Sequence, residues 1–171
     1  MKRFFIDKLA RIIKARKQLE KELNVKISNN GKEITIDGTP EEEYIAEKII
    51  NAVDFGFPSE IALFVKEEDF LFEIINIKNH TKRTDLERIR ARIIGTKRKT
   101  LNAIEQLTKC FFQVKGNEVA IIGDAEFIPN AQEAIISLIR GAKQANVYAY
   151  LEKHQVMPVI DLGLKIKEKK E

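Results

Sequence analysis

A cluster of basic side chains is the part of this 171-residue sequence whose residue types and spacing point most clearly to chemistry. Between residues 78 and 99 it has nine basic residues against two acids, for a net charge of +7. The basic residues are Lys78, Lys82, Arg83, Arg88, Arg90, Arg92, Lys97, Arg98 and Lys99, and the acids are Asp85 and Glu87. Like charges this crowded destabilise a fold unless a polyanion binds them. We therefore expect this segment to bind phosphate groups.

Residue types for covalent or metal chemistry are scarce. Cys110 is the one cysteine, which excludes an internal disulfide framework, and His80 and His154 are too far apart in sequence for a zinc signature. We find no pair of carboxylates and no nucleophile with a base at a plausible spacing, so we expect no enzymatic activity, no metal and no cofactor. No apolar run approaches the roughly 18–20 residues that span a bilayer. We expect a cytoplasmic protein without membrane contact.

An internal repeat organises the chain. A constant shift of 85 positions places residues 27–53 over residues 112–138, so that Gly31 falls on Gly116 and Gly38 on Gly123. Glycine matches carry the most weight, because glycine marks backbone geometry that other residues resist. A fixed period predicts two copies of one supersecondary unit.

Each copy predicts the same order of elements. An amphipathic helix (16–23; 100–107) precedes a strand (25–28; 110–115), a glycine turn, a second strand (33–37; 118–122) and a longer helix. Thr39-Pro40 is typical of the start of such a helix. A further strand is predicted at 70–77, a short helix within 58–69 and a last helix at 146–155.

The second copy resembles a K-homology (KH) domain. The residues that carry the resemblance are Arg92-Ile93-Ile94-Gly95-Thr96-Lys97-Arg98-Lys99-Thr100, Ile104-Glu105 and the hairpin that ends at Gly123. The resemblance implies an α+β fold of two tandem type I KH domains (β-α-α-β-β-α), each a three-stranded sheet covered by helices on one face. The division that we expect is a degenerate first domain at 1–57, a helical linker at 58–69, a second domain with a C-terminal helix at 70–154, and a basic tail at 155–171.

In the KH family, two helices flank a GxxG loop that lies against the phosphates of single-stranded RNA. Here the loop reads Gly95-Thr96-Lys97-Arg98, so an arginine replaces the last glycine. Without that glycine the loop backbone is less suited to a close approach to a phosphate, but the arginine adds a cation that can bind phosphate through its side chain. The RNA-binding residues that the resemblance implies are Arg88, Arg90, Arg92, Ile94, Gly95, Thr96, Lys97, Arg98, Lys99 and Lys115.

The first copy lacks both loop glycines. The local match places Lys14-Ala15-Arg16-Lys17 in the loop, whereas the strict shift of 85 places residues 10–13 there. We favour a domain kept for packing or protein contacts. The alternative is weak contact with an RNA backbone through Lys14, Arg16 and Lys17.

The resemblance narrows to one group when Val119-Ala120-Ile121-Ile122-Gly123 and the segment from Leu138 to Glu152 are added. That group is the archaeal and eukaryotic KH ribosome-assembly factor that partners the endonuclease maturing the 3′ end of small-subunit rRNA. It implies a non-enzymatic protein that binds the single-stranded 3′ region of this rRNA, with the pre-rRNA endonuclease and a translation initiation factor subunit as partners. The alternatives are a protein-interaction adaptor that docks a nuclease or translation factor, and a general single-stranded RNA binder.

Three positions have specific structural expectations. Phe112 aligns with Ile27 and is predicted to be a core residue, which leaves Phe111 on the other face of the strand as a candidate for stacking on a base. Glu105 aligns with Glu20 and is predicted to serve helix geometry or an ion pair. Cys110 is predicted to be a small structural residue rather than a nucleophile.

Overall fold

Two α/β units follow one another in the computed structural model, which describes residues 1–155, 159–160 and 166–167. The first unit contains, in chain order, β1 (Lys2–Phe5), α1 (Leu9–Leu23), β2 (Lys26–Asn30), β3 (Glu33–Asp37) and α2 (Pro40–Phe55). Its antiparallel sheet has the order β1-β3-β2. Two short helices follow it, α3 (Ser59–Ala62) and the 3₁₀ helix η1 (Leu63–Lys66).

The second unit has a sheet of the same type with the order β4-β6-β5. Its elements are β4 (Phe70–Asn76), η2 (Ile77–Asn79), α4 (Leu86–Ile94), η3 (Thr96–Arg98), α5 (Lys99–Thr108), β5 (Phe111–Lys115), β6 (Glu118–Asp124), α6 (Ile128–Ile139) and α7 (Gln144–Lys153). Two further short strands, β7 (Val159–Ile160) and β8 (Ile166–Lys167), pair with each other. Most of the predicted basic tail lies outside the described residues.

The units differ at the place where the sequence predicts a loop between two helices. In the second unit α4 and α5 flank residues 95–98, as predicted. In the first unit α1 is the one helix between β1 and β2, so its order is β-α-β-β-α and the predicted β-α-α-β-β-α is wrong there. Lys14, Arg16 and Lys17 lie inside the continuous helix α1, as do residues 10–13. Neither proposed register therefore gives the first unit a loop.

Local sequence chemistry explains the start of α2. Thr39 accepts a hydrogen bond from the Glu42 backbone N–H, and the Glu42 carboxylate accepts one in return from the Thr39 N–H at 2.9 Å. This capping box satisfies two helix-end donors, and Pro40 occupies the first helical position, where no N–H is needed. The predicted helix start at Thr39-Pro40 is confirmed.

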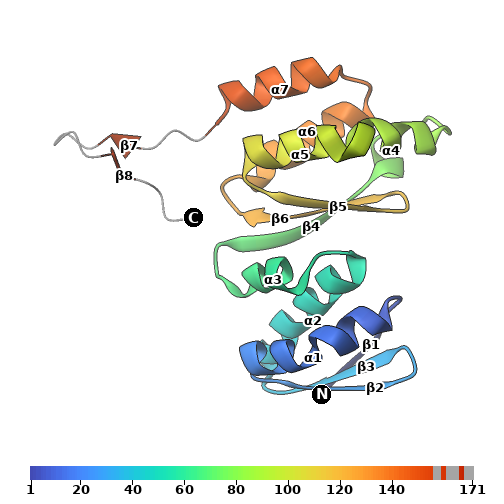
Figure 1. Ribbon diagram of the computed structural model, residues 1–171, viewed down its shortest axis with the longest axis vertical. Coiled ribbons are helices and arrows are strands. Elements are labelled where there is room, and N and C mark those ends of the chain that lie inside the picture. Colours follow the sequence, from blue (N-terminus) through green and yellow to red (C-terminus); the bar gives the residue numbers. More distant parts are fainter. Residues whose placement is uncertain (156–158, 161–165, 168–171) are drawn as a thin grey trace.

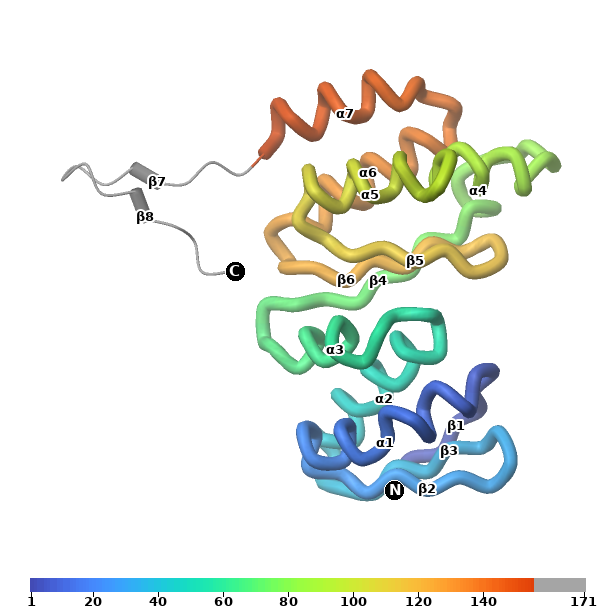
Figure 2. Tube along the Cα trace, viewed as in Figure 1, coloured from blue at the N-terminus to red at the C-terminus, as the bar shows by residue number. Residues whose placement is uncertain are grey.

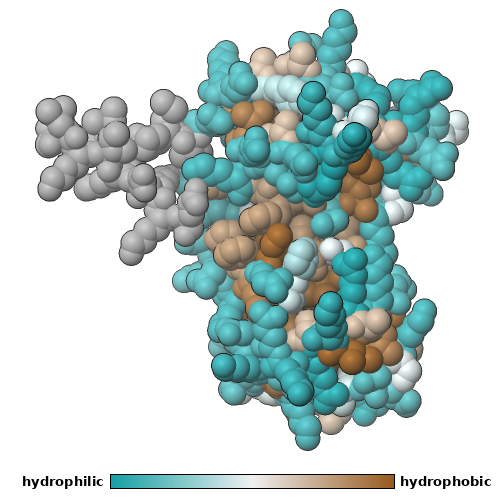
Figure 3. All heavy atoms as spheres, viewed as in Figure 1, coloured by the Kyte–Doolittle hydropathy of each residue, from teal (hydrophilic) through white to brown (hydrophobic). Residues whose placement is uncertain are grey.

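The two units stack in alternating layers. Figure 1 and Figure 2 show the first sheet, then its helices, then the second sheet, then the helices α4 to α6 with α7 outermost. Phe64 of η1 stacks on Phe70 and Phe111 of the second sheet, with ring centroids 5.4 and 5.8 Å apart. Figure 3 shows apolar surface gathered at this level, between the two units. Phe111 therefore packs against the preceding helical segment, and the idea that it stacks on a base is not supported.

The sheet of the second unit also contributes to the core of the first. Ala120 and Ile122 of β6 lie in the apolar cluster of α1 and α2, while Phe112 and Ile121 lie in the cluster of the second unit. Phe112 is a core residue, as predicted. A polar contact joins the units as well: Lys115 Nζ lies 3.0 Å from Asp7 Oδ2, and this hydrogen bond lowers the pKa of the Asp7 carboxyl below its usual value.

Cys110 precedes β5 and is buried. Burial raises the pKa of its thiol to about 12. Because the thiolate is the reactive form, we expect roughly a thousandfold slower reaction with a thiol reagent in the folded protein than in denaturant at mildly alkaline pH. A disulfide-exchange reagent followed by absorbance measures this ratio, and equal rates in the two states would contradict the buried position.

Among the described helices, none is both long enough and apolar enough to cross a membrane.

Candidate nucleic-acid interface

The loop at residues 95–98 begins at a glycine that has no room for a side chain. Gly95 ends α4 with φ +75°, and its N–H donates to the Ala91 carbonyl at 2.8 Å. A Cβ at this position would lie 2.3 Å from Thr100 Oγ1 and 2.7 Å from the Thr100 backbone nitrogen. The backbone of Gly95 therefore lies directly against the first turn of α5, which brings the ends of the two helices close together.

The next residues turn outward in an unusual conformation. Lys97 and Arg98 both have positive φ, +52° and +63°, although each carries a Cβ. Thr96 and Lys97 are exposed at the tip of the loop, and α5 starts immediately after it at Lys99. The N-terminus of a helix of this length carries a partial positive charge and unpaired N–H donors, which suits a phosphate.

The structure separates the predicted RNA-binding residues into two groups. The first group is exposed and makes no side-chain hydrogen bond or ion pair within the described residues: Arg88, Thr96, Lys97 and Lys99. The second group is held by other parts of the protein. Arg90 Nη1 donates to the Gly116 carbonyl at 3.0 Å, Arg92 Nη2 donates to the Ala142 carbonyl at 2.6 Å, and Lys115 pairs with Asp7. Some of the basic residues therefore make structural contacts within the protein.

Ile94 is only half-buried, and it lies between the buried Ile93 and the tight turn at Gly95. It is the apolar residue nearest the loop on α4. This position agrees with its predicted place beside the loop.

Helix α7 supports the base of the loop, a role that the sequence analysis did not predict. Gln144 Nε2 donates to the Arg92 carbonyl at 3.3 Å and to Thr100 Oγ1 at 3.4 Å. One side chain thus connects the end of α4 with the start of α5. Gln144 has no charge and no motif, so nothing in the sequence marked it.

A shallow hollow lies beside the other end of α4. It has a volume of about 590 Å³ and is lined by Thr84, Asp85, Leu86, Glu87, Arg88, Arg90 and Asn117. Asn117 comes from the turn between β5 and β6, so the hollow lies between that turn and the first turn of α4. Arg83 donates two hydrogen bonds to Asp85 and lowers the pKa of its carboxyl.

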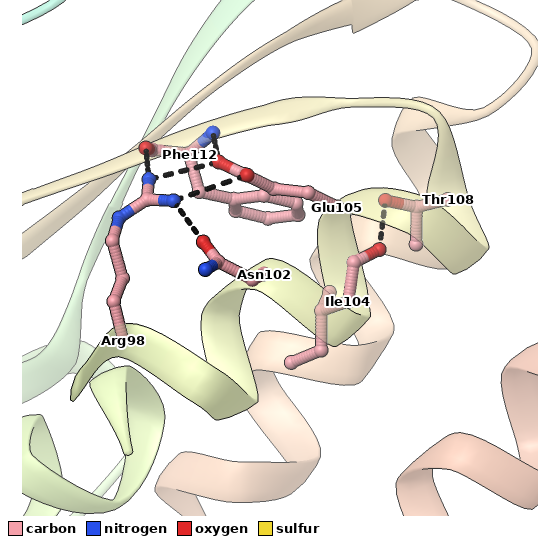
Figure 4. A network of polar contacts seen from close by, with 6 residues as sticks. All are labelled: Arg98, Asn102, Ile104, Glu105, Thr108 and Phe112. Carbon is pink, nitrogen blue, oxygen red and sulfur yellow. Dashed lines mark hydrogen bonds and ion pairs between the residues drawn. The ribbon is translucent and has the colours of Figure 1, made fainter. Parts of the chain in front are cut away.

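Arg98 lies in the loop, but its guanidinium points back to the protein (Figure 4). Its nitrogens contact both Glu105 carboxylate oxygens at 2.8 and 3.1 Å, and Nη2 also donates to the Phe112 carbonyl at 2.7 Å. Glu105 was predicted to serve either helix geometry or an ion pair, and the structure shows the ion pair, with Arg98. Arg98 was expected to offer a free cation to phosphate, and in this structure its guanidinium already has protein partners.

The three candidate residues of the first unit are arranged differently from the loop. Lys14 and Lys17 are exposed on α1, and Arg16 Nε donates to Glu20 Oε1 at 3.2 Å. Because α1 is uninterrupted, these residues have no exposed helix N-terminus beside them.

Among the residues that the structure describes, no cluster of three or more histidine, cysteine or acidic side chains is suited to a metal.

Comparisons with known proteins agree with this geometry. The family model for the second KH domain of PNO1, described as eukaryotic type KH-domain (KH-domain type I), matches residues 71–156. The chain belongs to this KH-domain family. The matched range covers the β4-to-α7 unit with its loop, and it leaves the first unit outside.

The relatives of this KH-family chain include a KH domain-containing protein and pre-rRNA-processing proteins. It is 35% identical over 147 residues to a KH domain-containing protein of Methanocaldococcus jannaschii, covering 82% of this chain and 65% of that protein. It is 34% identical over 111 residues to the pre-rRNA-processing protein pno1 of Aspergillus fumigatus, covering 63% and 44%. The chain thus spans less than two thirds of the length of these relatives.

Solved structures resemble the KH-family chain over most of its length. A crystal structure of Dim2p from Pyrococcus horikoshii has a TM-score of 0.82 at 33% identity, covering 90% of this chain and 98% of that one. A crystal structure of the a/eIF2α–aDim2p–rRNA complex from the same organism has a TM-score of 0.80 at 33% identity, covering 89% and 92%.

Proposed function

We propose that this protein is a non-enzymatic RNA-binding factor in the 3′-end maturation of small-subunit pre-rRNA, and that residues 70–154 hold single-stranded rRNA. The observation that carries the proposal is the loop at 95–98. It joins a glycine with no room for a Cβ, an exposed tip with Lys97, and the N-terminus of α5, which no side chain caps. That combination suits a phosphate backbone, and the pre-rRNA-processing relatives favour rRNA as its source.

The exposed group of residues defines the contact. Phosphates lie against Thr96, Lys97 and the first N–H groups of α5, with Lys99 next to them. About four nucleotides extend from the loop along α4 toward Arg88 and the hollow beside Asn117, with their bases over the half-buried side chain of Ile94. Arg90, Arg92 and Lys115 shape this surface through their intramolecular contacts rather than binding RNA directly.

The remaining parts of the proposal concern partners and organisation. We assign residues 1–57 to a degenerate KH domain, 58–69 to a helical linker and 155–171 to a basic tail. The first domain lacks the helix-loop-helix and so suits protein contacts. The pre-rRNA endonuclease and a translation initiation factor subunit are the proposed partners, and the a/eIF2α–aDim2p–rRNA complex of a similar protein supports the second of them. We place the protein in the cytoplasm.

Salt dependence of RNA binding tests the proposed contact. Each phosphate contact with single-stranded RNA adds about −0.7 to the slope of log affinity against log salt. Lys97→Ala combined with Lys99→Ala is therefore expected to flatten the slope by about 1.4 and to weaken binding. Fluorescence anisotropy with a short oligonucleotide that copies the 3′ end of small-subunit rRNA measures both effects.

Two controls make that experiment specific. Lys14→Ala combined with Lys17→Ala removes the same charge from α1 and should leave the slope nearly unchanged. A scrambled oligonucleotide separates an rRNA factor from a general RNA binder, because the proposal requires weaker binding to the scrambled sequence. If the α1 variant flattened the salt slope and the loop variant did not, the RNA contact would lie in the first unit. No binding of either oligonucleotide would favour an adaptor that binds protein alone.

A further inference from the structure

Arg98 has a strained backbone, and both terminal nitrogens of its side chain are hydrogen-bonded to the protein. Its φ of +63° and ψ of 19° are left-handed, a conformation that is unfavourable for a residue with a Cβ. Such a conformation persists only where surrounding contacts hold it. The guanidinium supplies them, because it bonds to Glu105, to Asn102 Oδ1 at 2.5 Å and to the Phe112 carbonyl at 2.7 Å.

Arg98 reaches the free edge of the second sheet through one of its partners, the carbonyl of Phe112 in β5, whereas Asn102 and Glu105 lie on α5. β5 pairs with β6 on one side only. At Phe112 its backbone N–H donates to Glu105 Oε1 at 3.1 Å, and its carbonyl accepts from Arg98. The two side chains together satisfy both backbone groups of one residue on this edge (Figure 4). The loop, α5 and β5 are thereby joined through a single ion pair.

The first unit has an equivalent contact between a carboxylate and the backbone of its sheet, but no cation from a loop. Glu20, 85 positions before Glu105, accepts a hydrogen bond from the Ile27 N–H at 2.8 Å, and Ile27 is 85 positions before Phe112. Its cation is Arg16, from the middle of α1, and not from a loop. The exposures match closely: the side chains of Arg16 and Glu20 are 39% and 27% exposed, and those of Arg98 and Glu105 are 37% and 23% exposed. The carboxylate therefore serves the sheet edge in both units, and only in the second does it also hold a loop.

We propose that Arg98 is a positioning residue whose ion pair with Glu105 fixes the loop at 95–98 in the shape that meets RNA. It does so in place of a glycine, whose freedom at positive φ would otherwise provide this conformation. The guanidinium makes no phosphate contact itself. This inference rests on the proposed RNA-binding function, which names the loop as the site.

Glu105→Gln tests the inference by the sign of its effect. If Glu105 were a bystander, removing a negative charge beside a phosphate site would leave RNA binding equal or tighter. Loss of the ion pair should instead weaken RNA binding about fivefold, the effect of about 1 kcal/mol. The salt slope should stay unchanged, because no phosphate contact is lost. Glu20→Gln is the matched control, since it removes the same charge from a carboxylate that accepts the same kind of backbone hydrogen bond, but it should leave RNA affinity as it is.

Arg98→Ala completes the test in RNA binding. We expect it to weaken binding about as much as Glu105→Gln without changing the salt slope. The double variant should bind no more weakly than either single variant, because both break one pair. A slope flattened by about 0.7 in Arg98→Ala, with wild-type affinity in Glu105→Gln, would overturn the inference and leave the proposed function standing.

Hydrogen exchange in the free protein tests the same inference without RNA. Backbone amides at 96–99 should exchange faster in Glu105→Gln than in the wild type and unchanged in Glu20→Gln, because only the first variant releases the loop. Equal exchange in the wild type and Glu105→Gln would contradict the role of Arg98. This result is independent of RNA binding, so failure of the proposed function alone would appear as absent RNA binding with the exchange pattern intact.

Discussion

Gly95→Ala is expected to weaken RNA binding at least about tenfold, because the loop cannot keep its shape when this residue has a side chain. The added Cβ would lie 2.3 Å from Thr100 Oγ1 and 2.7 Å from the Thr100 backbone nitrogen. The second atom belongs to the backbone of α5, so a rotamer change at Thr100 does not relieve the contact. The end of α4 and the start of α5 must move apart, which displaces the proposed phosphate site.

Gly31→Ala provides the matched control for this substitution. Gly31 has φ +59°, so an alanine there has a similar left-handed cost, but its Cβ would meet nothing within 4 Å. The control should lose about 1–2 kcal/mol of folding free energy and no RNA affinity. Thermal melting and anisotropy on both variants separate backbone strain from loop displacement. RNA affinity of Gly95→Ala equal to that of Gly31→Ala would contradict the loop as the site.

Gly123→Ala is expected to lower the free energy of unfolding by about 2–3 kcal/mol through overpacking beneath β6. A Cβ at Gly123 would lie 2.4 Å from Cys110 Sγ and 3.1 Å from Cys110 Cβ. Cys110 is buried and cannot move its sulfur into solvent. Chemical denaturation measures the loss.

Cys110→Ala in the Gly123→Ala background should recover most of that stability. It removes the sulfur and leaves the Cβ contact of 3.1 Å, which a shift of a few tenths of an ångström relieves. The two substitutions should therefore be strongly coupled, with the double variant more stable than the sum of the single effects predicts. Additive losses would show that the added methyl group meets something other than the thiol.

The second unit was predictable from sequence because its signals are local and mutually consistent. The glycine turn at Gly116 lies between β5 and β6, and the alternation at Phe111 and Phe112 matches the two faces of β5. The helix-loop-helix was found from Ile93-Ile94-Gly95 and the family resemblance. In each case a residue type with a strong backbone or burial preference marked the element.

The first unit was harder to predict for physical reasons. The family resemblance implied a first strand in this unit, but the residues did not locate β1, because Phe4 and Phe5 break the alternation typical of a strand, and Phe5 is 78% exposed. A counterpart of the loop at 95–98 was expected in the first unit because the internal repeat suggested one. The structure instead has the 15-residue helix α1, whose buried positions Ile12, Leu19 and Leu23 continue through the supposed loop.

The sequence predicted where the site lies, but not which of its basic residues bond to other parts of the protein. Charge alone marked the segment from 78 to 99 as a phosphate-binding region, and the predicted RNA-binding residues included Arg90, Arg92 and Arg98. Arg90, Arg92 and Arg98 instead bind backbone carbonyls or carboxylates elsewhere in the fold. The partners of Arg90 and Arg92 come from distant positions in the chain, so the tertiary structure was needed to identify them. The partner of Arg98, Glu105, is near in sequence, but the sequence did not show that the two residues pair.

The most direct test of the central claim is to locate RNA on the protein residue by residue. Amide resonances of the ¹⁵N-labelled protein would be followed by NMR during titration with the oligonucleotide that copies the 3′ end of small-subunit rRNA. We expect the largest shifts at Gly95 to Thr100, with smaller ones at Arg88 and Asn117 and none at Lys14 to Lys17. Shifts centred on α1, with the loop amides unmoved, would contradict the account.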